Sequence, residues 1–343
     1  MSGVFTLFDH AKMFDAKGES ILPVANILQQ HDPIINDMVL IESNSDSGHQ
    51  YAVQTGLPEV TWRRAYEGVQ PSKGTQRVVN ETYGRASTVS LTDVAVADKG
   101  GKSAVIRAEQ ASRHLEAMSQ EMAGKIIYGS AADNEKSFVG LAARYNDKDA
   151  DSGRNLFNAG GNANRSSIYL VGWAKNKIFT FFPKGTKAGI THYDFGGKPV
   201  DVIDANGGTY PAYKDQYEWL MGLGVQDWRY GARIANINVN DLNSKQKCAA
   251  LYDKFMEALN SIQNLNGIKL VAYASRKVKF ALRNGALASG GQASTVQTGP
   301  TINQNNNLTS SGATGYSEYD LVIDGIHIKA EDAIKENEDA VSF

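Results

Sequence analysis

Apolar and small residues recur at helical spacing between residues 103 and 128. The stripe consists of Ala104, Ala108, Ala111, Leu115, Met118, Met122 and Ile126. Steps of three and four residues place these side chains on one face of a helix. Ser103 suits the N-cap position and Gly129 ends the pattern. We therefore predict a helix over Ser103–Tyr128, about 38 Å long.

The second half of the chain shows shorter periodic segments. Cys248, Leu251, Phe255, Leu259 and Ile262 mark an amphipathic helix that ends near Gly267. The remaining predictions are short helices over 213–223 and 276–284 and strands over 227–238, 269–273 and 319–330. Strand-like runs with glycine turns are expected over 168–204, a loop over 145–167, and a loop or an irregular strand over 292–315.

Residues 51–69 and 76–96 are rich in β-branched and aromatic side chains, and the Pro and Gly of a turn lie between them. This pattern predicts a long two-stranded hairpin. Its sides would carry Trp62, Arg63, Arg64, Tyr66, Arg77 and Tyr83. A lone hairpin is marginally stable in water, so it must lie on its own domain or on a neighbouring molecule.

Charge is distributed unevenly near the N-terminus. Residues 1–50 carry a net charge of −5, whereas residues 51–90 carry +2. Two solvated faces would explain this difference. In the alternative, the acidic segment of one molecule contacts the basic segment of another.

Composition narrows the class of protein. The 343 residues are 42% hydrophobic and 21% charged, which permits a sizeable core. The net charge of −2 argues against a strongly basic nucleic-acid binder. One cysteine, Cys248, excludes an intramolecular disulfide and favours a reducing compartment. We expect no signal peptide and no membrane span, because no apolar run approaches the required length.

The sequence motifs that would indicate catalysis or ligand binding are weak. Gly101-Lys102-Ser103 lacks the first glycine of a phosphate-binding loop. Asp147, Asp149 and Asp151 have calcium-loop spacing, but the later glycine and glutamate positions are occupied by Ser152 and Asn158. His192 beside Asp194 is a candidate general base, although a lone loop histidine is more often structural. We expect Cys248 to be a core residue.

Three segments resemble a known family: ILPVANILQQHDPIINDMVLIES, GLPEVTWRRAYEGVQPSKGTQRVVNETYGRASTVSLTDVAVAD and WLMGLGVQDWRYGARIANI. They are similar to the major capsid proteins of tailed phages with the Hong Kong 97-like fold, and nearest to those of short-tailed, epsilon-fifteen-like phages. The order of elements is similar too, and the likeness spans essentially the whole chain. These motifs carry no chemistry, so the resemblance implies a shell subunit and not an enzyme.

The resemblance implies an α+β, Hong Kong 97-like phage capsid fold. It implies the following ranges: N-terminal arm 1–50, extended E-loop hairpin 51–95, P domain 96–164 with spine helix 103–128, A domain 165–265, and a return through the A and P domains with the C-terminal strand over 266–343. The subunit would assemble as pentamers and hexamers into an icosahedral head enclosing phage double-stranded DNA.

Further implications concern partners and location. The implied partners are other copies of the chain, a portal, a scaffold and a cement or decoration protein, with no membrane, cofactor, metal or catalytic residue. The procapsid would mature, and the protein would be made in the host bacterial cytoplasm and reside in the virion. Some family members form a lysine–asparagine crosslink; Lys73 lies at the presumed hairpin tip, but nothing else marks the other partners.

We predict inter-subunit contacts at Trp62, Arg63, Arg64, Tyr66, Lys73 and Arg77 on the hairpin and at Asp9, Asp15 and Glu19 on the arm. Packing of these residues within one subunit is the alternative. Two other functions stay open at this point. One is an encapsulin-like protein compartment, and the other is an α/β enzyme whose site the motifs do not reveal.

Overall fold

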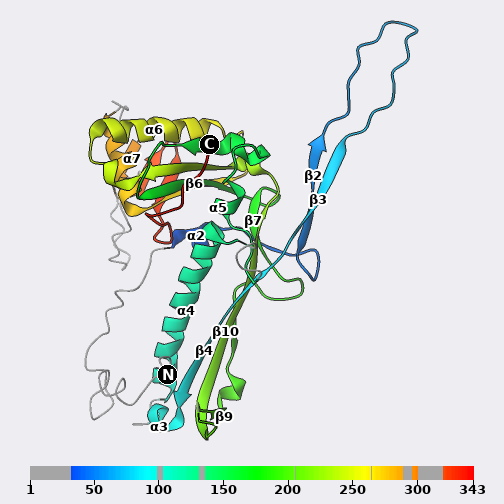
Figure 1. Cartoon of the computed structure of the whole chain (residues 1–343). Helices are drawn as coiled ribbons and strands as arrows, with labels where there is room; N and C mark the ends of the chain where they lie inside the picture. The colour runs from blue at the N-terminus through cyan, green and yellow to red at the C-terminus, as the bar shows by residue number, and fades with distance from the viewer. Residues whose placement is uncertain are drawn as a thin grey trace, which may run out of the picture.

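A computed structural model describes residues 32–98, 103–130, 136–204, 206–263, 265–288, 296–299 and 320–343. It shows a body from which two extensions run in different directions (Figure 1). One extension contains α4 and the long strands β4 and β10, and the other is the β2–β3 hairpin. No helix in the described ranges is long and apolar enough to cross a membrane.

The body is built on a mixed sheet in which β6 runs between β11 and β12. Every residue of β6 after Arg165 is buried, as expected for a strand covered on both faces. The strands of this part, in spatial order, are β13 (Val296–Gly299), β14 (Asp320–Ile323), β15 (Ile326–Ala330), β12 (Lys269–Ala274), β6 (Arg165–Trp173), β11 (Gly231–Asn238) and β5 (Leu156–Asn158).

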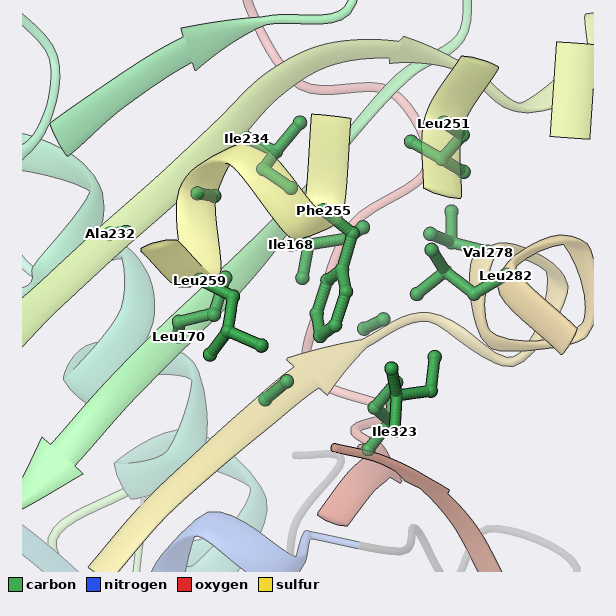
Figure 2. Packing of buried hydrophobic residues seen from close by; sticks show 14 of the residues in the cluster. Ile168, Leu170, Ala232, Ile234, Leu251, Phe255, Leu259, Val278, Leu282 and Ile323 are labelled. Atoms are coloured by element: carbon green, nitrogen blue, oxygen red, sulfur yellow. The ribbon is translucent and has the colours of Figure 1, made fainter. Parts of the chain in front are cut away.

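Two helices, α6 (Lys245–Asn260) and α7 (Arg276–Ala288), cover one face of the body sheet. Figure 2 shows Phe255 of α6 among strand and helix side chains. The residues labelled there are Ile168, Leu170, Ala232, Ile234, Leu251, Phe255, Leu259, Val278, Leu282 and Ile323. The predicted second helix is confirmed, with Cys248 buried in this core. It ends at Asn260, before the predicted end near Gly267.

The second face of the sheet packs against α4 (Ser103–Tyr128). Tyr169, Val171 and Trp173 share a core cluster with Met122 and Ile126 of this helix. The predicted helix range is confirmed, although Ser103 is its first residue and not a flanking cap. The predicted stripe is correct in the second half only. Ala104, Ala108 and Leu115 are exposed, whereas Ile106 and Gln110 are buried, because this half lies beyond the body.

Beyond the body, α4 lies along a ladder of β4 (Gly84–Asp93) and β10 (Thr209–Val225). The two strands pair antiparallel from Ala212↔Asp93 to Met221↔Gly84. Two short strands, β8 (Ile190–Tyr193) and β9 (Val200–Ile203), also pair with β10. The body end of β10 pairs with β7 (Ile178–Phe182), which also pairs with β1 (Leu40–Glu42).

The helix predicted over 213–223 is wrong, because this segment is the middle of β10. Asp215, Tyr217, Trp219 and Met221 are buried, and the residues between them are half-buried, which is the period of a strand. The local pattern of residues 213–223 fits either a helix or a strand. Pairing with β4 and β7 makes this segment a strand. At Gly222 a Cβ would lie 2.4 Å from the Phe181 ring, so glycine permits the close approach.

The hairpin prediction is correct in its first part only. Strand β2 (His49–Gly56) pairs with β3 (Thr75–Glu81), and residues 57–74 join them without regular secondary structure. The predicted second strand, 76–96, is divided in three: β3 ends at Glu81, β4 pairs with β10, and α3 follows as Val94–Ala97. The chain therefore turns from one extension into the other around Gly84, where a Cβ would lie 2.9 Å from Phe138.

Other predictions are confirmed with shifted boundaries. The helix expected over 276–284 continues to Ala288, and the strand expected over 269–273 is β12. In 227–238 only β11 is a strand, after the 3-10 turn Trp228–Tyr230. The loop 145–167 also contains the 3-10 turn Asp151–Asn155 and two strand segments, β5 and the start of β6. The C-terminal strand is a hairpin turning at Asp324-Gly325, both with positive φ.

Short elements complete the described fold. Helix α2 (Pro33–Asp37) brings the chain onto the body, and α5 (Leu141–Arg144) follows α4. The 3-10 turns Phe195–Gly197 and Val239–Asp241 join strands to later elements. After β15, the chain lies against β6 and β11, where buried Glu338 pairs with Arg233 at 2.9 Å.

Candidate assembly surface

The hairpin tip, defined as residues 57–74, exposes large apolar side chains that no described part of the subunit covers. Trp62 is 97% exposed and Tyr66 is fully exposed. Leu57, Val60 and Val69 are exposed beside them. Isolated exposed apolar residues are common, but this set is gathered on one projecting segment (Figure 1). The tip is therefore the strongest candidate for a contact with another molecule.

Hydrogen bonds within the tip shape its turn. The backbone N–H of Arg64 donates to Glu67 Oε2 at 2.8 Å, and Arg63 Nη1 donates to the Glu67 carbonyl at 3.2 Å. Tyr66 has a φ of 71°, the left-handed region that non-glycine residues adopt at a cost of about 1–2 kcal/mol. Ser72 Oγ donates to the Glu59 carbonyl at 3.0 Å and joins the two sides of the tip.

The structure brings the predicted hairpin residues together. Trp62, Arg63, Arg64, Tyr66 and Lys73 lie in the exposed tip, and exposed Arg77 lies in β3. The side chains of Arg64, Lys73 and Arg77 make no ion pair with another described residue. The predicted arm residues Asp9, Asp15 and Glu19 lie outside the described residues. The predicted contacts between subunits stay predictions.

A partly buried polar network fixes the base of the hairpin to the body. Arg144 of α5 donates two hydrogen bonds of 2.8 Å to the Glu81 carboxylate and a third of 3.0 Å to the Leu223 carbonyl. The Tyr51 hydroxyl lies 2.8 Å from Glu81 Oε1 and 3.0 Å from the Val225 carbonyl. Burial and the nearby Glu81 carboxylate raise the pKa of Tyr51, so its hydroxyl keeps its proton.

Aromatic packing adds to this attachment. Phe179 and Phe181 of β7 are fully buried against Tyr51, with Tyr83 packed beside them. The His49 ring lies 5.2 Å from the Phe179 ring and 5.5 Å from the Phe181 ring. Burial lowers the pKa of His49, which favours the neutral ring. Sequence reasoning missed this base, because its residues come from five segments with no shared spacing.

His192, the candidate general base, is held by contacts with neighbouring side chains. His192 Nε2 lies 2.9 Å from Asp215 Oδ1, and its ring stacks on Tyr217 with 4.7 Å between centroids. Arg107 of α4 also binds Asp215, through bonds of 3.0 and 2.7 Å. The partner of His192 is therefore Asp215, and not the sequence neighbour Asp194. The cluster links β8 and β10 to α4, and a histidine in such a pair is explained by packing.

The remaining candidate chemical groups give no defined site. The Asp149 N–H donates to Asp147 Oδ1 in an ordinary turn. Among the described residues, no group of three or more His, Cys, Asp or Glu side chains is arranged to bind a metal ion. Burial raises the pKa of the Cys248 thiol, which disfavours the reactive thiolate. Lys102 of the Gly-Lys-Ser segment lies outside the described residues.

The fold is that of the Hong Kong 97-like phage capsid proteins. The chain matches a structure of bacteriophage epsilon15 with a TM-score of 0.69 and 24% identity, covering 99% of this chain and 98% of the other. Weaker matches are the capsid of a native GTA particle, with a TM-score of 0.46, 8% identity and coverage of 63% of this chain and 94% of the other, and the SrpI encapsulin of Synechococcus elongatus, with a TM-score of 0.42, 10% identity and coverage of 64% and 92%.

A model of the family named major capsid protein GP7 matches residues 15–342. Because the match covers nearly the whole chain, the chain belongs to this family of major capsid proteins, the structural subunits of phage head shells. A comparison with curated proteins found no match. The family match favours the phage capsid over both the encapsulin-like compartment and the α/β enzyme.

Proposed function

We propose that this major capsid protein assembles as pentamers and hexamers into an icosahedral head, with the hairpin tip contacting a neighbouring subunit. One observation supports this most directly. Trp62 and Tyr66 are uncovered at the end of a hairpin whose base is fixed by the partly buried Arg144–Glu81 pair. A fixed base with an uncovered apolar end suits a contact made outside the subunit.

The domain ranges are part of the proposal. Residues 1–50 form the N-terminal arm, 51–95 the E-loop, 96–164 the P domain, 165–265 the A domain, and 266–343 the return. The observed pairing adds one refinement. Strand β4 pairs with β10 beside α4, so residues 84–93 group with the P domain and the E-loop ends at β3.

Burial of aromatic side chains supplies the main energy of the proposed contact. An aromatic side chain removes about 150–250 Å² from water, which corresponds to an upper bound of about 4–6 kcal/mol. Exposed ion pairs of Arg63, Arg64 or Arg77 with the acidic arm of a neighbour would each contribute about 0–1 kcal/mol. These pairs would set register and salt sensitivity more than strength.

We further infer that the shell encloses double-stranded DNA without sequence-specific binding, and that portal, scaffold and cement proteins complete the particle. The support is the family and the near-neutral net charge of −2. A strongly basic inner wall would retain DNA through many phosphate contacts. We propose a structural role without catalysis, and assign no residue to a reaction.

Sedimentation velocity with negative-stain electron microscopy tests the contact. The wild type is compared with Trp62→Ala, a deletion of residues 1–30, and Phe280→Ala, which removes an exposed aromatic side chain from the body. We expect shells or capsomers from the wild type and Phe280→Ala, and their loss in the first two variants. Thermal melts of the Trp62→Ala subunit should match the wild type within about 0.5 kcal/mol.

A small oligomer that forms equally from the wild type, Trp62→Ala and the deletion variant, even with a scaffold co-expressed, would contradict the proposed assembly mode. Shells that form normally from Trp62→Ala would contradict the tip contact while leaving the family assignment intact.

A further inference from the structure

Helix α7 lies on the outer side of the body, on the sheet face opposite to α4 (Figure 1). Its inner side packs into the core through Val278, Ala281, Leu282, Gly285 and Ala286. Its outer side leaves two large apolar side chains exposed, since Phe280 and Leu287 are each 62% exposed. This outer side is therefore a second place, apart from the hairpin tip, where apolar surface faces outward.

The outer residues of α7 form one stripe. Arg276, Phe280, Arg283 and Leu287 follow one another at steps of four, three and four residues. These steps place them on one face of the helix, over about 17 Å of its length. We define these four residues as the α7 stripe, in which cationic and apolar side chains alternate.

Helix α7 is basic along its length. Its 13 residues include no acidic side chain and four cationic ones, which are Arg276, Lys277, Lys279 and Arg283. The chain as a whole has a net charge of −2. Arg283 makes no ion pair with another described residue. The local charge of α7 therefore favours an anionic partner.

The C-terminal segment shows how α7 binds acidic side chains. Arg276 Nη2 lies 2.6 Å from Asp332 Oδ2, and Lys277 Nζ lies 2.6 Å from Glu336 Oε2. Both pairs lie at the first turn of α7. An acidic segment of the protein itself thus covers the beginning of the α7 stripe, and the stripe continues beyond these pairs.

A hollow of about 380 Å³ opens beside Phe280. It is lined by Val239, Asn240, Leu242 and Asn243 and by Arg276, Lys277 and Phe280 of α7. Its lining combines apolar side chains with two cations. Such a lining suits an apolar anchor that has a carboxylate close to it.

We propose that the α7 stripe and the adjoining hollow bind an acidic amphipathic helix of a partner protein. Apolar side chains of the partner, at steps of three and four residues, pack on Phe280 and Leu287, and its carboxylates pair with Arg283. The exposed apolar side chains favour a protein over DNA, because phosphates are bound by cationic and polar groups. The inference does not rest on the proposed assembly contacts.

Fluorescence anisotropy with the full-length protein tests the proposal. The probe is a labelled peptide of about 18 residues, made of leucine, alanine and glutamate, with leucines at steps of three and four residues. A peptide of the same composition with scattered leucines is the control. We expect the first peptide to bind at least about tenfold more tightly than the second. Its affinity should fall as the salt concentration rises.

Variants locate the site on the protein. Phe280→Ala and Leu287→Ala should each weaken binding of the peptide by about tenfold. Arg283→Gln should weaken it by about threefold and reduce its salt dependence. Arg64→Gln and Phe195→Ala change side chains that are exposed elsewhere, and both variants should bind the peptide like the wild type.

Equal affinity for the two peptides, or equal affinity of the wild type and Phe280→Ala, would overturn the proposal. Double-stranded DNA or vesicles of anionic phospholipid that bind through Arg283, without binding of the peptide, would overturn it in favour of those partners. Loss of shells or capsomers in Phe280→Ala would make this face a contact between copies instead. If Phe280→Ala assembles normally and the peptide does not bind, the inference fails while the proposed head assembly stands.

Discussion

The base and the tip of the β2–β3 hairpin belong to one structural element but differ in where their side chains find contacts. At the base, Arg144 and Glu81 satisfy each other inside the protein, against fully buried aromatic rings. At the tip, Trp62 and Tyr66 are left uncovered. The base therefore determines how firmly the hairpin is attached, and the tip determines what the hairpin can contact.

The first prediction removes the polar attachment at the base. Arg144→Ala should lower the free energy of unfolding by about 3–5 kcal/mol, because it leaves the Glu81 carboxylate buried without its partner. Urea denaturation of the full-length subunit measures the change. Arg63→Ala at the tip should change stability by no more than about 0.5 kcal/mol. Equal losses in the two variants would contradict the contrast between base and tip.

A smaller effect is expected from one hydroxyl group. Tyr51→Phe removes the donor to Glu81 and Val225 while keeping the aromatic ring, and should cost about 1–2 kcal/mol. Tyr66→Phe is the matched change at the tip, where no described partner binds the hydroxyl, and should leave the unfolding midpoint unchanged. A neutral result for Tyr51→Phe would show that packing alone fixes the base.

The smallest effect concerns pH. Because burial lowers the pKa of His49, its contribution to stability is present above the unfolded value of about 6.5 and is lost as pH falls. Relative to His49→Gln, the wild type should therefore lose stability between pH 7.5 and pH 5.5. His327→Gln, at an exposed position of β15, should follow the wild type. The same dependence in all three proteins would exclude His49 as its source.

Regular local patterns predicted much of the fold. The range of α4 and the core positions of α6 followed from helical spacing, because both helices bury one continuous face for much of their length. The prediction was wrong for 213–223 and incomplete for 76–96. In both cases the local pattern suits more than one element, and pairing with a distant strand decided between them.

The sequence also indicated the residues of the hairpin tip better than it indicated the residues that fix the base of the hairpin. Aromatic and basic residues between turn signals marked the hairpin tip, where exposure depends little on distant residues. Glu81 and Arg144 could not be joined from the sequence, because 63 positions separate them and neither belongs to a recognisable motif.

The sequence by itself determined the family, the spine helix and the segment that carries the exposed aromatic residues. Only the tertiary structure decided that β4 leaves the hairpin for β10 and that Glu81 is neutralised by Arg144. Helical periodicity is set by neighbours three or four residues apart. Strand pairing and buried charge depend on residues brought together by folding, and their energies arise only when water is excluded between them.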